Sequence, residues 1–135
     1  MKYEIFEHTA DIGIRIFGSS YEEIFNNSVE SFSDLIVDTG SLEGSNVQEI
    51  SIRSDSPDLL LVDLLSLILY DFEGEGILYF KADLEYSDEN VSLTGRMYGS
   101  EIPENVDYRN VIKAVTYHSL EVSPEKGYAK VVFDI

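Results

Sequence analysis

The chain has 135 residues, with 26 acidic side chains against nine lysines and arginines and a formal net charge of −17. This length predicts one domain, 1–135, that buries roughly two thirds of the surface exposed by the unfolded chain. The negative charge repels phosphate, so direct binding to nucleic acid is not expected. A basic protein partner or bound cations fit better. The absence of cysteine excludes disulfides and thiolate chemistry.

Two strand-like runs open the chain. Residues 3–7 alternate between apolar and polar side chains. They lack the charged and apolar regions of a signal peptide, so a cytoplasmic location is expected. The second run, 12–18, places Ile12, Ile14 and Ile16 on one face, which is the period-two pattern of a half-buried strand.

A first helix is predicted after Ser20, because Glu23 three residues later completes a capping box. Apolar residues then recur at spacings of three and four and predict one buried face: Tyr21, Ile24, Phe25, Phe32, Leu35 and Ile36. Residues 39–46 are expected to form a loop and 47–53 a strand.

A second helix is predicted in the leucine-rich segment that follows. Ser56 or Asp55 suits its cap, Pro57 its first position, and Gly74 or Gly76 its exit. The apolar run is shorter than the ~20 residues of a membrane span. Because its apolar residues go almost all the way round, the helix is expected to be enclosed by other elements.

Four more strands are predicted over 77–86, 91–98, 111–122 and 128–134. Turn-forming residues at 87–90 and 123–127 link consecutive strands into hairpins, and 99–107 is expected to be a loop. This order of elements predicts an α+β fold in which largely antiparallel sheet packs with two helices.

The sequence offers little support for an enzyme. His8 and His118 match no zinc-ligand spacing, and we expect them to be hydrogen-bonded structural residues. No nucleophile elbow and no phosphate-binding glycine loop is present. The protein is therefore not expected to be a catalyst by itself.

Two acids near the ends of the sequence suggest a different site. If the ends meet in the fold, Asp11, Asp134 and the Ile135 carboxylate supply the oxygen ligands that Ca²⁺ or Mg²⁺ prefers. From the spacing alone, Asp11 is more simply a residue that caps a turn at a strand end, and Asp134 a solvated strand end. Lys113 is compatible with a surface charge or with a contact to an anion such as phosphate. Arg15 and Arg109 have the same two interpretations.

Several motifs in register resemble the archease family. They are HTADIGIRIFG at 8–18, the helix segment at 22–25, VDTG at 37–40, the leucine-rich helix ending at 69–70, KAVTYH at 113–118 and the terminal FDI. The resemblance implies an α+β assembly of strand-helix-strand-strand modules. It also implies metal ligation by Asp11, Asp134 and Ile135, and a partner or phosphate contact by Lys113.

The family assists the GTP-dependent RNA-splicing ligase, which attaches GMP to its own histidine with Mn²⁺. The resemblance thus implies an activator of ligase guanylylation and turnover in tRNA splicing, with Ca²⁺ as the expected metal and Mg²⁺ or Mn²⁺ as alternatives. Neither direct binding to nucleic acid nor association with a membrane is expected. Relatives carry a histidine and an acid before the lysine, where this chain has Val106 and Val111.

Two other functions remain open from the sequence. One is a chaperone-like helper for RNA-modifying enzymes such as tRNA methyltransferases, which the small acidic surface suggests. The other is a stand-alone metal-dependent hydrolase, which only the oxygen-rich ligand set suggests.

Overall fold

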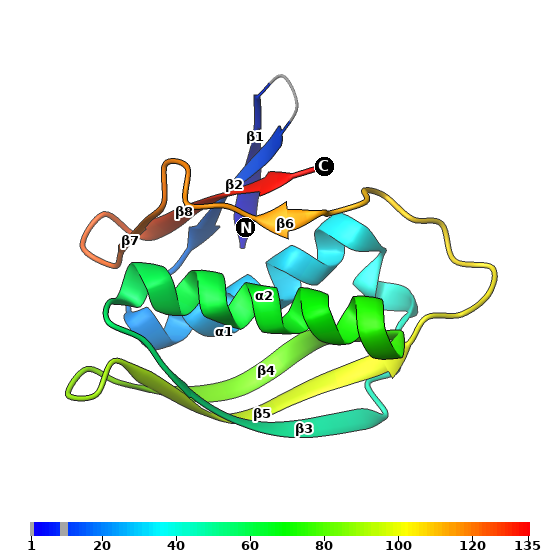
Figure 1. Ribbon diagram of the computed structural model, residues 1–135, viewed down its shortest axis with the longest axis horizontal. Helices are drawn as coiled ribbons and strands as arrows, with labels where there is room; N and C mark the ends of the chain where they lie inside the picture. Colours follow the sequence, from blue (N-terminus) through cyan, green and yellow to red (C-terminus); the bar gives the residue numbers. More distant parts are fainter. Residues whose placement is uncertain (1, 9–10) are drawn as a thin grey trace.

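The computed structural model describes residues 2–8 and 11–135, except for the side chains of Glu7 and His8. Two sheets enclose a layer formed by two α-helices, as Figure 1 shows. The α+β prediction is confirmed. The expected structural role of the His8 side chain lies outside the described residues.

The elements alternate between the layers along the chain. The helices are α1 (Tyr21–Ile36) and α2 (Pro57–Glu75), and a 3-10 turn, Thr39–Ser41, follows α1. The five-stranded sheet contains β1 (Tyr3–His8), β2 (Asp11–Phe17), β6 (Ala114–Val115), β7 (Glu121–Ser123) and β8 (Tyr128–Asp134). The three-stranded sheet contains β3 (Asn46–Arg53), β4 (Ile77–Ser87) and β5 (Ser92–Glu101).

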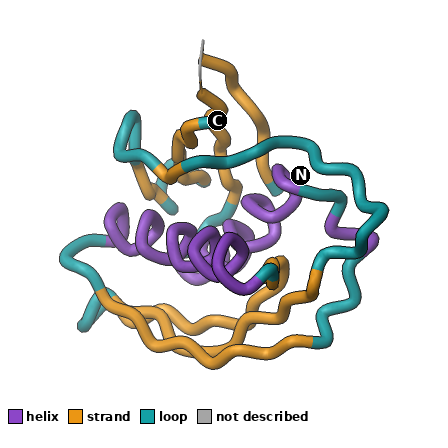
Figure 2. Tube along the Cα trace, turned by 45° about the vertical axis from the view of Figure 1, so that its right-hand side comes forward, coloured by secondary structure: helices purple, strands orange, loops and turns teal. Residues whose placement is uncertain are grey.

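The strands of both sheets pair in antiparallel fashion. The larger sheet has the order β1-β2-β8-β6, and β7 also pairs with β8. The smaller sheet has the order β3-β5-β4, so β3, α2, β4 and β5 form a strand-helix-strand-strand unit. In Figure 2 the helices lie between this sheet and the larger one. The order of strands brings β2 and β8, from opposite ends of the sequence, side by side.

The capping box at the start of α1 is confirmed. The Ser20 hydroxyl accepts a hydrogen bond from the Glu23 N–H at 3.1 Å. The Glu23 carboxylate in turn accepts from the Ser19 N–H at 2.8 Å, one residue earlier than in the usual box. The first bond satisfies a main-chain donor that the first turn of a helix leaves free, and the second ties the preceding residue to that turn.

Helix α2 begins and ends where the sequence predicts, but it is not enclosed on all sides. The Ser56 hydroxyl accepts from the Leu59 N–H at 3.2 Å, and Gly76 ends the helix in a left-handed conformation with φ of 72°. A stripe containing Asp63 and Tyr70 faces solvent, with Tyr70 75% exposed. The expectation of full enclosure is wrong because the two sheets and α1 cover only part of the helix circumference. No helix in the described part of the chain has both the length and the apolar character to cross a membrane.

The core joins all three layers. Ile12, Ile14 and Ile16 are buried on the inner face of β2, as their alternation predicts. The rings of Phe32 in α1 and Phe133 in β8 lie 5.2 Å apart, centre to centre. This contact fixes β8, and with it the end of the chain, on the helix layer.

The predicted strand 111–122 is wrong over most of its length. Within this segment only β6 and β7 pair with β8, and the residues between them form a turn in which Ser119 has a left-handed φ of 53°. The Thr116 hydroxyl donates to the Val132 carbonyl at 2.8 Å and accepts from the His118 N–H at 3.2 Å. The Thr116 side chain thus holds the turn that interrupts the strand, which the apolar alternation does not reveal.

The predicted loop after β5 begins later than expected, because β5 continues to Glu101. We call residues 102–113 the strap, since they cross from the three-stranded sheet to the five-stranded one (Figure 1). Its main chain is held to α1: the Arg109 N–H donates to the Ile36 carbonyl at 2.8 Å, and Tyr108 forms a β-bridge with Val37.

Candidate metal and partner-contact site

The register of β2 against β8 places Asp11 directly opposite Asp134. Directly opposite residues of antiparallel strands point to the same face, with Cβ atoms about 4.5–5.5 Å apart. The two carboxylates are therefore neighbours, although the whole domain separates them in the sequence. Asp11 is half-buried and Asp134 is exposed. Ile135 follows directly and is 40% exposed.

Lys113 joins these acids through the main chain. Its N–H donates to the Asp134 carbonyl at 2.8 Å, and the next residue, Ala114, lies opposite Asp134 in the sheet. The Lys113 side chain is exposed, and it forms no ion pair with the described residues. The structure thus brings three of the four predicted site residues to one end of the five-stranded sheet, with Ile135 adjacent.

His118 lies beside Asp11, which sequence reasoning missed. A hollow of about 290 Å³ is lined by Asp11, His118, Ser119 and Val132. The imidazole is exposed and makes no hydrogen bond to the described atoms, contrary to its expected structural role. The sequence feature that could have indicated this position is its place in the KAVTYH motif, five residues after Lys113. The turn held by Thr116 makes it a neighbour of Asp11.

The donor chemistry at Asp11 and Asp134 fits a hard divalent cation, because both side chains offer carboxylate oxygens. Two side chains are too few to hold such an ion alone. Within the described residues, no three His, Cys, Asp or Glu side chains are placed to hold a metal. A metal held by Asp11 and Asp134 would therefore need a further oxygen donor from outside that set.

Arg15 and Arg109 have structural partners. Arg15 bonds Glu4 at 2.6 Å, and its guanidinium lies over the ring of Phe6. Arg109 bonds the Asp34 carboxylate at 3.1 Å and so ties the strap to α1. Of the three cations considered from the sequence, only Lys113 is free of an ion pair with the described residues.

Asp34 also holds the start of the chain. Its carboxylate accepts a hydrogen bond from the Tyr3 hydroxyl at 2.7 Å. Burial, followed by this bond and the Asp34 charge, raises the pKa of Tyr3 to about 12. β1, α1 and the strap thus meet at one carboxylate.

The sequence model of the Archease protein family matches residues 3–135. The chain belongs to the archease family. It is 46% identical over 135 residues to the protein archease of Thermoplasma volcanium, with 100% of both chains covered. It is 44% identical to that of Thermoplasma acidophilum, covering 100% of this chain and 94% of the relative.

A solved archease-like structure shares the fold. The solution structure of Methanobacterium thermoautotrophicum protein 1598 superposes with a TM-score of 0.82 at 32% identity, covering 99% of each chain. Family and fold therefore agree over the whole described domain. Within it, the end of the sheet at Asp11, Asp134 and Lys113 is the candidate site.

Proposed function

We propose that this protein activates a GTP-dependent RNA-splicing ligase, promoting guanylylation of the ligase and its repeated turnover in tRNA splicing. The observation that carries the proposal is the juxtaposition of Asp11, Asp134 and Lys113 in a member of the archease family. The protein assists the ligase and does not join RNA itself.

In this proposal the two acids and the Ile135 carboxylate hold a divalent cation, Ca²⁺ before Mg²⁺ or Mn²⁺. When bound, the cation supplies a positive centre that attracts phosphate or carboxylate oxygens. Asp11 and Asp134 come from adjacent strands of one sheet, so their relative position is fixed before any ligand arrives. A preformed pair of this kind loses little conformational entropy on binding.

Lys113 provides a separate contact. Its ammonium is exposed and unpaired among the described residues, and its main chain lies next to Asp134, to which it is bonded. We assign it to a phosphate group of the nucleotide or to an acid of the ligase, since a lysine offers three rotatable donors to either.

A modest decrease in the activation free energy of guanylylation is sufficient for activation. Each ~1.4 kcal/mol by which the protein lowers the barrier for guanylylation increases the rate tenfold. Fixing the geometry of reacting groups supplies energies of this size in enzymes generally. The net charge of −17 also favours approach to a basic ligase surface.

The test is guanylylation of the ligase from the same organism, with this protein at substoichiometric concentration. We expect the covalent ligase-GMP product to form faster, and ligation to continue over many turnovers. Equal rates and yields with and without the protein overturn the proposal. Stabilisation of a tRNA methyltransferase without any effect on the ligase indicates the chaperone-like role instead. Nucleotide hydrolysis by the purified protein alone indicates a hydrolase.

A further inference from the structure

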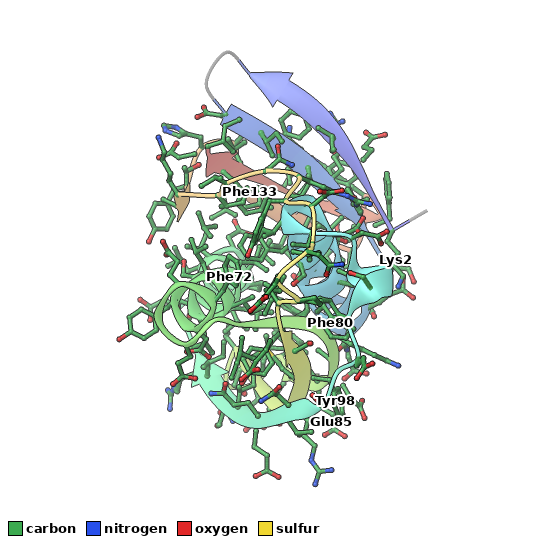
Figure 3. All side chains as sticks on the ribbon, turned by 90° about the vertical axis from the view of Figure 1, so that its right-hand side faces the viewer. Lys2, Phe72, Phe80, Glu85, Tyr98 and Phe133 are labelled. Atoms are coloured by element: carbon green, nitrogen blue, oxygen red, sulfur yellow. The ribbon has the colours of Figure 1, made fainter. Side chains whose placement is uncertain are left out.

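A second hollow lies under the strap, away from the acids. It has a volume of about 290 Å³ and lies between the strap and the C-terminal ends of α1 and α2. Its lining is mostly apolar: Ile36, Phe72, Glu73, Tyr108, Asn110, Val111 and Ile112. In Figure 3, Phe72 lies between α2 and the strap. We call this feature the strap hollow.

Two residues of the strap hollow expose large apolar surfaces. Val111 is 71% exposed and Tyr108 is 57% exposed. Exposed apolar side chains that surround a hollow, unlike scattered ones, are typical of an interaction site. By contrast, Val106 of the same strap packs against the core. Of the two departures from the family motif, Val111 is therefore the more exposed.

The main chain holds these residues in place. The Tyr108 bridge to Val37 and the Arg109 N–H bond to Ile36 anchor one end of the segment. The Asn110 side chain donates to the Leu35 carbonyl at 2.8 Å. The apolar groups are thus presented by a fixed backbone, which reduces the entropy lost when a partner binds.

One acid, Glu73, lines the strap hollow, and the chain as a whole carries a net charge of −17. The strap has two cations: Arg109 is bonded to Asp34, and Lys113 has no ion pair with the described residues. An apolar hollow on so acidic a protein is complementary to an apolar side chain flanked by lysines or arginines. A second copy of this chain is a poor match, because it brings the same net charge of −17.

The strap hollow lies close to Lys113 of the candidate site. Val111 precedes Lys113 by two residues, and the Lys113 N–H is bonded to Asp134. One partner surface can therefore contact both. We propose that the strap hollow receives an apolar side chain of the ligase, flanked by basic residues, as a second anchor for the complex. The identity of the partner rests on the function proposed above.

The test compares Val111→Glu and Val111→Lys for affinity to the ligase, measured by calorimetry. If the contact is apolar, both charges weaken binding, by roughly tenfold or more, because both must be desolvated in the interface. If only net charge matters, Val111→Lys weakens binding while Val111→Glu does not, and that result overturns the inference. Thermal unfolding of both variants checks the fold, which a residue this exposed should not perturb.

Tyr70→Ala provides the matched control, because Tyr70 is at least as exposed as Val111 but does not line the strap hollow. Tyr108→Ala should weaken binding and Tyr70→Ala should not. If the native protein stimulates the ligase and all four variants bind equally well, the strap hollow is not an anchor, and the proposed function stands. If the native protein does not bind the ligase, the proposed function fails as well. Self-association that Val111→Glu abolishes in sedimentation identifies a second copy as the occupant and overturns the inference.

Discussion

The side-chain amide of Asn26 forms both main-chain hydrogen bonds of Leu84, as a neighbouring strand would do. Its Nδ2 donates to the Leu84 carbonyl at 3.0 Å, and its Oδ1 accepts from the Leu84 N–H at 2.8 Å. Along the same strand, the Glu22 carboxylate accepts from the Tyr86 N–H at 3.2 Å, and the Ser33 hydroxyl donates to the Tyr79 carbonyl. Side chains of α1 thus close the edge of β4 against pairing with other chains.

We predict that Asn26→Ala lowers the free energy of unfolding by about 1–3 kcal/mol, because two partly buried main-chain groups lose their partners. Urea unfolding measures this change. Asn105→Ala serves as the control, since Asn105 is exposed in the strap. Equal midpoints for Asn26→Ala and the native protein would show that water replaces the amide at no cost.

The proposed metal site gives a second prediction. Millimolar Ca²⁺ should raise the melting temperature of the native protein, because binding to the folded state alone stabilises it by mass action. Asp11→Asn and Asp134→Asn each remove a negative ligand, and a residue added after Ile135 displaces its carboxylate. All three variants should lose most of the response.

Glu89→Gln is the matched control for this experiment. Glu89 is an exposed acid in the turn between β4 and β5, far along the chain from the candidate ligands. Its replacement removes one negative charge, as Asp11→Asn and Asp134→Asn do, and should leave the Ca²⁺ response intact. A response that is identical in all the proteins places the metal elsewhere among the acids.

A third prediction concerns Lys113. Lys113→Glu should abolish stimulation of the ligase and leave the melting temperature nearly unchanged, because an exposed lysine contributes little to stability. The rate of guanylylation measures the first effect. Lys81→Glu makes the same change of charge on β4 of the other sheet and should retain stimulation. Full activity of Lys113→Glu would make this lysine an ordinary surface residue.

The dependence on salt is a fourth prediction. Affinity for the ligase should fall as salt is added, because screening weakens the attraction between a basic surface and this acidic chain. In the same assay, RNA alone should show no detectable binding to the protein, since the net charge opposes phosphate. Tight binding of RNA at physiological salt would contradict this expectation.

Alkaline pH should weaken the fold through Tyr3 and Tyr86. Burial first, and then hydrogen bonds to Asp34 and Asp88 respectively, raise the pKa of each hydroxyl to about 12. Unfolded tyrosines titrate near pH ~10. The folded state therefore favours the neutral hydroxyls. Their contribution to the free energy of unfolding is complete below pH ~10 and is lost as pH rises through about 12. Urea unfolding of the native protein and Tyr3→Phe at pH values across this window tests it, because their stabilities should converge. A constant difference would contradict the linkage.

The elements with local signals were predictable from the sequence. Caps at Ser20 and Ser56, and the glycine exit at Gly76, lie within a few residues of the helix ends that they define. The alternation of Ile12, Ile14 and Ile16 reports burial on one face directly. These features depend on neighbours in the sequence, so reading the sequence recovers them.

The arrangement of the candidate site was not predictable in this way. The alternation of apolar and polar residues in β2 and in β8 shows neither that the two strands pair nor in which register. That register places Asp11 opposite Asp134. Only the family resemblance brought these residues together. The position of His118 depended further on the bonds of Thr116, which break a strand that the alternation predicts as continuous.

The pairing of β2 with β8 makes the candidate site the last part of the domain to be completed during synthesis. A nascent chain that ends before β8 contains Asp11, but it lacks Asp134 and the carbonyl that anchors Lys113. Contacts between distant parts of a sequence also form slowly, since a long loop must close first. Truncated or partly folded molecules therefore do not hold Asp11 and Asp134 side by side, and the candidate site exists only in the finished domain.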